Sequence, residues 1–258
     1  MNLFKNLIEY RELLRTNVKK EIRGKYKGSF LGIIWSFLNP ILQIMVYAIV
    51  FPFILRNREP NYIAFLACGI FPWTWFTTSI SQGTHVILSN GNIIKKIYFP
   101  REIMPISIVT AGLVNFMIQS FIILALLCIS RIGIAFYYPF FLVIAIIQYF
   151  LTLGIVLITS ACEVYVRDLE YIVNFFVSLA FYATPILYSP STLSNSRFAW
   201  IFKVNPLSTI ILNYRQIFIN KEMPDFRALT IVFVESLLLC IIAMFIFRKL
   251  EKGFAENL

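Results

Sequence analysis

The chain is poor in charged residues and in the side chains that most enzymes use for catalysis. Asp, Glu, Lys and Arg make up 14% of its 258 residues, against about 25% in soluble domains. It has one histidine, His85, and its aspartates are Asp168 and Asp225, with no DxD motif. A membrane-embedded glycosyltransferase or acyltransferase needs acid–base groups clustered at one membrane face. The sequence gives that class of function little support.

Two further absences restrict the chemistry. The chain has no GxxxxGK[ST] phosphate loop, so it is not expected to hydrolyse ATP by itself. Its four cysteines lie in apolar blocks without CxxC spacing, which indicates packing residues rather than disulfides or metal ligands. His85 has no second histidine to share a metal with. No metal site and no cofactor are therefore predicted on this chain.

Long apolar blocks dominate the sequence. Hydrophobic residues make up 59% of the chain and the mean hydropathy is +0.77. A helix that crosses a bilayer needs about 20 consecutive, mostly apolar residues. The blocks predict an all-α polytopic membrane protein with six transmembrane helices, at about 29–55, 61–82, 103–130, 137–162, 171–188 and 228–247.

Two segments outside these blocks have their own character. Residues 2–22 carry apolar residues at spacings of three and four with charges between them, which is typical of a helix lying in the membrane interface. An ordinary soluble amphipathic helix would show the same pattern. Residues 189–227 are rich in proline and polar residues but keep short apolar pieces. They predict short helices on or dipping into the membrane.

A basic island at 88–102 separates the second and third apolar blocks. The turn signal Asn90-Gly91-Asn92 opens it, and Pro100 biases Phe99 away from helix. Between them, Lys95 and Lys96 alternate with large apolar residues. A simple connector with topology-setting lysines would not need that apolar face. The alternative interpretation is a docking segment for another protein.

The distribution of cations predicts the topology. With six spans both termini lie on one side, and that side would carry fifteen Lys and Arg residues against eight on the other. The positive-inside rule then places both termini, and the island at 88–102, in the cytoplasm. Residues 189–227 become external.

Several motifs, in order along the chain, resemble those of polysaccharide-export ABC transporter permeases. The first is Tyr26 to Trp35, YKGSFLGIIW, followed by Asn39-Pro40, and the second combines Phe71-Pro72-Trp73 with Asn92 to Pro105, NIIKKIYFPREIMP. The others are Arg167-Asp168, Thr184 to Tyr188 (TPILY), Asn205-Pro206-Leu207 and Phe247 to Glu251 (FRKLE). The similarity covers essentially the whole chain.

This resemblance implies the membrane subunit of an ATP-driven exporter in the bacterial plasma membrane. Its substrate would be a polysaccharide linked through pyrophosphate to a polyprenyl lipid, of the O-antigen, capsule or wall teichoic acid type. Two copies of the permease would pair with two nucleotide-binding subunits, which bind ATP and Mg²⁺. The family plan also has an N-terminal interface helix, a cytoplasmic coupling helix after the second span and short external helices before the sixth. An ABC permease for small lipids or drugs is the alternative.

The resemblance names the island as the coupling helix. Contacts with the ATPase are therefore expected from Asn92, Lys95, Lys96, Tyr98, Phe99, Pro100, Arg101 and Glu102.

An anionic pyrophosphate at the cytoplasmic face would be captured by cations, for which arginine offers bidentate geometry. The candidates are Arg23, Lys25, Lys27, Arg101 and Arg167. Equally, these cations could only anchor helices to lipid phosphates.

Aromatic residues make up 17% of the chain and could stack on sugar rings along a channel. The candidates are Trp35, Tyr47, Phe51, Trp73, Trp75, Phe181, Tyr182 and Tyr188. Interfacial aromatic belts and lipid-facing phenylalanines would give the same composition.

Overall fold

The computed structural model describes residues 8–24, 30, 32–55, 61–133, 135–189 and 199–258. Within these residues every regular element is helical, which confirms the predicted all-α class. The structure is built on four long helices: α4 (Tyr62–Thr84), α7 (Ile103–Ile129), α8 (Phe141–Glu163, preceded by the 3₁₀ turn η2, Tyr138–Phe140) and α12 (Phe226–Glu251). These four are long and apolar enough to cross a membrane.

Small residues allow the long helices to approach one another closely. A side chain at Gly154 of α8 would lie 2.9 Å from Leu239 and 3.2 Å from the backbone nitrogen of Cys240 in α12. A side chain at Gly112 of α7 would likewise collide with the Trp75 ring of α4. Without a hydrophobic driving force inside lipid, such close backbone packing is a main source of helix association. It holds α12 against α8 and α7 against α4.

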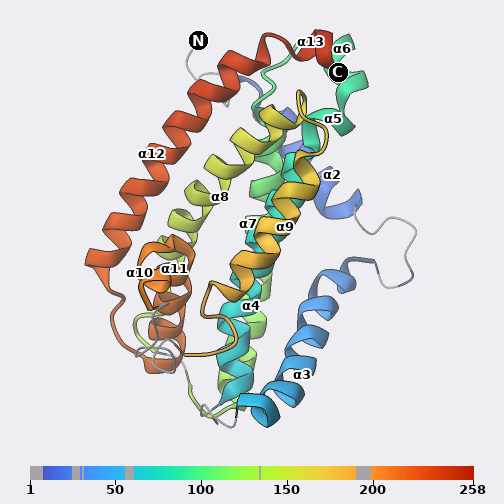
Figure 1. The fold of residues 1–258 in the computed structure, drawn as a ribbon. Helices are drawn as coiled ribbons and strands as arrows, with labels where there is room; N and C mark the ends of the chain where they lie inside the picture. The colour runs from blue at the N-terminus through green and yellow to red at the C-terminus, as the bar shows by residue number, and fades with distance from the viewer. Residues whose placement is uncertain (1–7, 25–29, 31, 56–60, 134, 190–198) are drawn as a thin grey trace.

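Two further apolar helices are shorter. The helix α3 (Trp35–Leu55) follows a 3₁₀ turn, η1 (Gly32–Ile34), and α9 (Leu169–Tyr182) follows α8. Figure 1 shows both beside the long helices. The predicted fifth span, 171–188, was too long, because α9 ends at Tyr182. Beyond it the chain turns, since Pro185 cannot donate a helical hydrogen bond and its carbonyl is bound by Arg215 of a later helix.

The predicted N-terminal interface helix appears as α2 (Arg11–Gly24), which packs against α7. Its predicted first residues, 2–7, lie outside the described residues. The side chains of Leu13 and Leu14 pack on the hydrophobic core, whereas the charged side chains of Arg15 and Lys19 are exposed. The helix is therefore amphipathic, as its residue pattern indicated.

The predicted short helices between residues 189 and 227 are α10 (Ala199–Val204), α11 (Pro206–Arg215) and the π-helical η4 (Gln216–Asn220). Positions 190–198 lie outside the described residues. Asn205 begins α11 by accepting a hydrogen bond from the Leu207 backbone at 3.0 Å, as a helix cap does. The interior face of α11 is buried, with Tyr214 and Ile210 fully enclosed. The helices α11 and η4 are therefore part of the packed bundle, whereas Trp200 and Val204 of α10 are exposed.

The molecule has two distinct ends (Figure 1). One end carries α5 (Val86–Ser89), α6 (Gly91–Lys96) and the C-terminal α13 (Phe254–Asn257), and the other carries α10 and α11. The long helices connect the two ends. The predicted coupling segment and the predicted external helices therefore lie at opposite ends.

Candidate functional site

The basic island folds as two short helices and an extended link. Asn90 separates α5 from α6, and its side-chain amide donates to the Val86 carbonyl at 2.9 Å. After Lys96 the backbone becomes extended at Ile97, and Pro100 keeps the residue before it out of helical geometry. The chain then enters α7 at Ile103. The turn at Asn90 and the proline at Pro100, both expected from the sequence, therefore mark the start of α6 and the end of the link.

One side of this segment is a solvent-facing mixture of apolar and basic residues. We call it the coupling edge and define it as Asn92, Ile93, Lys95, Lys96, Ile97 and Tyr98. Tyr98 is 81% exposed and Ile97 61%. Exposed apolar groups of this size, rimmed by cations, are typical of surfaces that bind a partner. Of the eight predicted coupling residues, the structure brings Asn92, Lys95, Lys96 and Tyr98 to this edge.

The other predicted coupling residues face inward. Phe99 is 7% exposed, Glu102 is 4% exposed and Pro100 is buried. Ile94, on the inner side of α6, is 5% exposed. A partner that touches the coupling edge would not reach these side chains directly. Their packing fixes the position of the edge against the bundle.

Arg101 joins the start of α7 to the C-terminal segment. Its Nη1 donates to the backbone carbonyl of Glu251, and its guanidinium lies 5.8 Å from the ring centre of Phe254. Tyr165, between α8 and α9, donates to the Leu250 carbonyl at 2.7 Å. Phe254 is fully buried beneath these contacts. The C-terminal segment is therefore fastened to both the coupling segment and the α8–α9 link.

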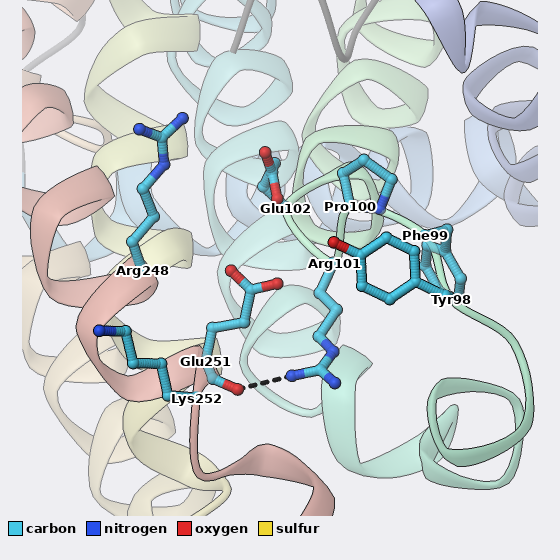
Figure 2. A pocket seen from close by; sticks show the side chains of 8 residues that line it. All are labelled: Tyr98, Phe99, Pro100, Arg101, Glu102, Arg248, Glu251 and Lys252. Carbon is cyan, nitrogen blue, oxygen red and sulfur yellow. Dashed lines mark hydrogen bonds between the residues drawn. The ribbon is translucent and has the colours of Figure 1, made fainter. Parts of the chain in front are cut away.

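A cavity of about 480 Å³ opens where these elements meet. Figure 2 shows its lining, with Arg101 reaching toward the Glu251 backbone. Three cations and two acids surround it, together with the aromatic and proline residues of the link: Arg101, Arg248, Lys252, Glu102, Glu251, Tyr98, Phe99 and Pro100. The cations suit a phosphate group, but the two acids reduce the positive potential there.

The predicted pyrophosphate ligands are only partly placed. Arg101 lines the cavity, whereas Arg167 is exposed in the α8–α9 link and does not contribute to the lining. Lys25, Lys27 and the side chain of Arg23 lie outside the described residues. The structure instead adds Arg248 and Lys252 to Arg101. Sequence reasoning missed both. The signal that could have found them is the large apolar side chain of Phe254 within an otherwise charged tail, which indicates that the tail folds back.

Four of the predicted channel aromatics form one group. Tyr47 of α3 lies 5.5 Å from Phe51 and 6.1 Å from Phe181 of α9, measured between ring centres. Phe181 lies 5.6 Å from Trp73 of α4. The group connects the two shorter apolar helices to the bundle. Trp73 is its buried member, at 6% exposure.

Of the remaining predicted aromatics, Tyr182 adjoins this group, with its ring centre 5.4 Å from that of Phe181. Trp75 is 2% exposed, stacks on Phe116 and donates from Nε1 to the Val109 carbonyl at 3.3 Å. Trp75 packs between α4 and α7. Tyr182 is 70% exposed, and Tyr188 donates to its carbonyl at 2.6 Å. Trp35 is half-buried at the start of α3.

Comparison with known proteins identifies the chain's relatives. Residues 12–219 match the ABC-2 type transporter family. The chain belongs to this family. It is 34% identical to the O-antigen export system permease protein RfbA of Myxococcus xanthus, over 100% of both chains. Two proteins of that name from Klebsiella pneumoniae are 36% and 35% identical, over 96% of this chain and 95% of theirs.

These comparisons confirm the resemblance to polysaccharide-export permeases. The chain is the transmembrane subunit of a polysaccharide exporter. Four helices long and apolar enough to span a bilayer agree with a multi-pass membrane protein.

Proposed function

We propose that this subunit moves a polysaccharide carried on polyprenyl pyrophosphate from the cytoplasmic side across the bacterial plasma membrane. The relatives are named for O-antigen export, which favours a polysaccharide over a small lipid or drug. The observation that carries the mechanism is the coupling edge, an exposed apolar and basic surface at one end of the bundle.

The energy for transport comes from a separate ATPase subunit, which holds ATP and Mg²⁺. The chain has no phosphate loop of its own, so force must reach it through a contact. Tyr98 and Ile97 offer exposed apolar area for that contact, and Lys95 and Lys96 offer charge. Because Phe99 and Glu102 are buried beneath the edge, a push on the edge is transmitted to α7.

The coupling edge and both termini lie in the cytoplasm, with α3 and α9 completing six spans. The side chain of Leu258 lies close to Gly91 of α6, because a Cβ added at Gly91 would be 3.5 Å from it. This contact puts the C-terminus and the coupling segment at one end, which supports the topology. The cavity with Arg101, Arg248 and Lys252 is then in position to receive the pyrophosphate.

Two copies of the chain enclose the transport path. No residue of α9 is buried, and its exposed side chains include Tyr171, Phe175, Phe176 and Tyr182. A helix this apolar and this exposed is suited to packing against a second copy of the chain. In such a dimer Tyr182, with the Tyr47–Phe51–Phe181 group beside it, could present aromatic surfaces to the glycan.

Coupling is tested by co-purification with the ATPase and by surface display of the polysaccharide. In the full chain, the combined change Lys95→Glu, Lys96→Glu and Tyr98→Ala should reduce ATPase recovery at least about tenfold, because a central interface Tyr alone often contributes about 2 kcal/mol or more. The control is Arg227→Glu, an exposed cation at the start of α12, and that end of α12 lies away from α13 and the coupling edge (Figure 1). If both variants retain ATPase and export equally, the coupling edge is not the contact.

A further inference from the structure

Three helices bring ionisable groups together near the coupling end. His85 directly follows α4, Glu163 ends α8, and Glu170 lies in the first turn of α9. His85 Nδ1 is 3.8 Å from Glu163 Oε1 and 3.5 Å from Glu170 Oε2. The prediction of no metal site considered only histidine partners for His85. The fold supplies two carboxylates instead.

Glu163 is unusual within this cluster. Its side chain is 1% exposed, and its Oε2 has no hydrogen-bond partner among the described residues. A buried carboxylate oxygen without a partner costs free energy. The Glu163 oxygen nearest His85 is Oε1, and a cation bound there could take Oε2 of the same carboxylate as a second ligand, which would remove that cost.

The cluster has an entrance from solvent. His85 and Glu170 are 47% and 36% exposed, and both line a cavity of about 540 Å³. The other ionisable residues in its lining are Lys20 and Glu21 of α2. Lys20 Nζ donates to Asn90 Oδ1 at 3.4 Å, so this hydrogen bond goes to an amide oxygen and not to one of these carboxylates. The cluster itself combines two carboxylates with one imidazole.

We propose that His85, Glu163 and Glu170 bind one divalent transition-metal ion of the Zn²⁺ type. One imidazole nitrogen with carboxylate oxygens is a donor set that suits Zn²⁺, Mn²⁺ or Fe²⁺, whereas Mg²⁺ and Ca²⁺ prefer oxygen alone. The three ligand atoms lie within 4.8 Å of one another. Bonds of about 2.0–2.2 Å place the ligands of one ion roughly 3.2–4.4 Å apart. Small side-chain rotations therefore complete the site, and a remaining position faces the cavity.

The ion would tie the start of α9 to the ends of α4 and α8. The chain continues from His85 directly into α5 and then α6, so the ion would also link α9 to the helices of the coupling segment. A metal at this junction stabilises one arrangement of these helices. The inference depends on neither the identity of the glycan nor the coupling proposal.

Zn²⁺ binding to the full-length purified chain tests the site. The chain carries a purification tag without histidine, is stripped with a chelator, dialysed against Zn²⁺ and analysed by mass spectrometry for metal content. About one Zn²⁺ per chain is expected. His85→Asn, Glu163→Gln and Glu170→Gln should each weaken Zn²⁺ affinity at least about tenfold, since even outer-shell changes cost 10–100-fold. Zn²⁺ should also raise the unfolding temperature of the unmodified chain but not of Glu170→Gln.

Two controls separate this site from other metal binding. Glu256→Gln removes an exposed carboxylate of α13, and Cys128→Ser removes an exposed thiol; both should leave binding unchanged. Because His85 is the only histidine, imidazole coordination of bound Co²⁺ can come only from this position. The proposal is overturned by metal content near zero, by equal affinity in His85→Asn and the unmodified chain, or by loss of binding in Cys128→Ser. If Glu163→Gln fails to fold, the Zn²⁺ affinity of Glu170→Gln decides the test, because the Glu170 side chain is 36% exposed.

Discussion

The guanidinium of Arg215 donates to the Ile186 carbonyl at 2.7 Å, although the two residues are separated by 29 positions in the sequence. It also binds the Pro185 carbonyl and lies 3.5 Å from the ring centre of Phe65. Arg215 is 5% exposed. This one side chain joins the end of α11, the turn after α9 and the start of α4.

Replacing Arg215 by Met should destabilise the protein severely. Two carbonyls would lose charged donors, each worth about 1.5–3 kcal/mol. Arg215→Lys should recover only part of the loss, because a lysine lacks the planar fork that reaches both carbonyls. The unfolding temperature of the detergent-purified chain measures the effect. Arg227→Met, at an exposed position of α12, is the control, and equal unfolding temperatures for Arg215→Met and the control would contradict the anchoring role.

Gln148 of α8 should tolerate an apolar replacement. Its Nε2 donates to the Pro72 carbonyl at 2.8 Å, but its buried Oε1 has no hydrogen-bond partner among the described residues. Gln148→Leu loses a bond worth about 0.6–1.7 kcal/mol in a membrane and removes an unpaired acceptor that costs about 1–3 kcal/mol. We expect stability that is unchanged or slightly higher, measured by thermal unfolding.

Glu at the same position should have the opposite effect. Gln148→Glu leaves the Pro72 carbonyl without the amide donor and introduces a buried carboxyl, so it should lower the unfolding temperature well below that of Gln148→Leu. If Gln148→Leu lowers the unfolding temperature below that of the unmodified chain, the amide hydrogen bond outweighs the unpaired oxygen.

A side chain at Gly154 should push α8 and α12 apart. An added Cβ would lie 3.2 Å from the Cys240 backbone, which cannot rotate away as a side chain can. Overpacking of this kind costs about 1–3 kcal/mol, so Gly154→Val should lower the unfolding temperature and the yield. Gly24→Ala, whose new Cβ would have no atom of the described residues within 4 Å, serves as the control and should be neutral. A neutral Gly154→Val would mean that the two helices are not in this close contact.

Tyr165 and Gly253 should be energetically coupled. A Cβ at Gly253 would run into the Tyr165 hydroxyl, which donates to the Leu250 carbonyl. Gly253→Ala should therefore loosen the C-terminal segment in the unmodified chain and do less damage in a Tyr165→Phe background. We expect a coupling of about 0.5 kcal/mol or more, as for residues in contact.

The coupling is measured by a double-mutant cycle of unfolding free energies, together with export. Additive effects of the two changes would show that the C-terminal segment does not depend on this contact. Tyr171→Phe, on the exposed surface of α9, is the control for removing a tyrosine hydroxyl.

Much of the fold could be predicted because its signals are local. Apolar blocks of sufficient length predict membrane helices, and Asn90, Gly91 and Pro100 delimit the coupling segment through backbone geometry. The end of α9 was predicted too late, since apolar residues continue to Tyr188 while Pro185 and the distant Arg215 reshape the turn. Half of the predicted coupling residues reached the exposed edge. Alternation along the sequence did not tell which side of α6 and the link would be buried.

The sequence by itself determined the class of protein and its family motifs. Composition and short-range pattern are enough to recognise them. The length of an apolar run decides whether a helix can cross a bilayer, and the spacing of apolar residues within one helix decides whether it is amphipathic. Only the tertiary structure decided which cations surround the Arg101 cavity, that Trp75 is a packing residue, and that His85 meets Glu163 and Glu170. Those groups lie on different helices, and helix packing sets the distances between them.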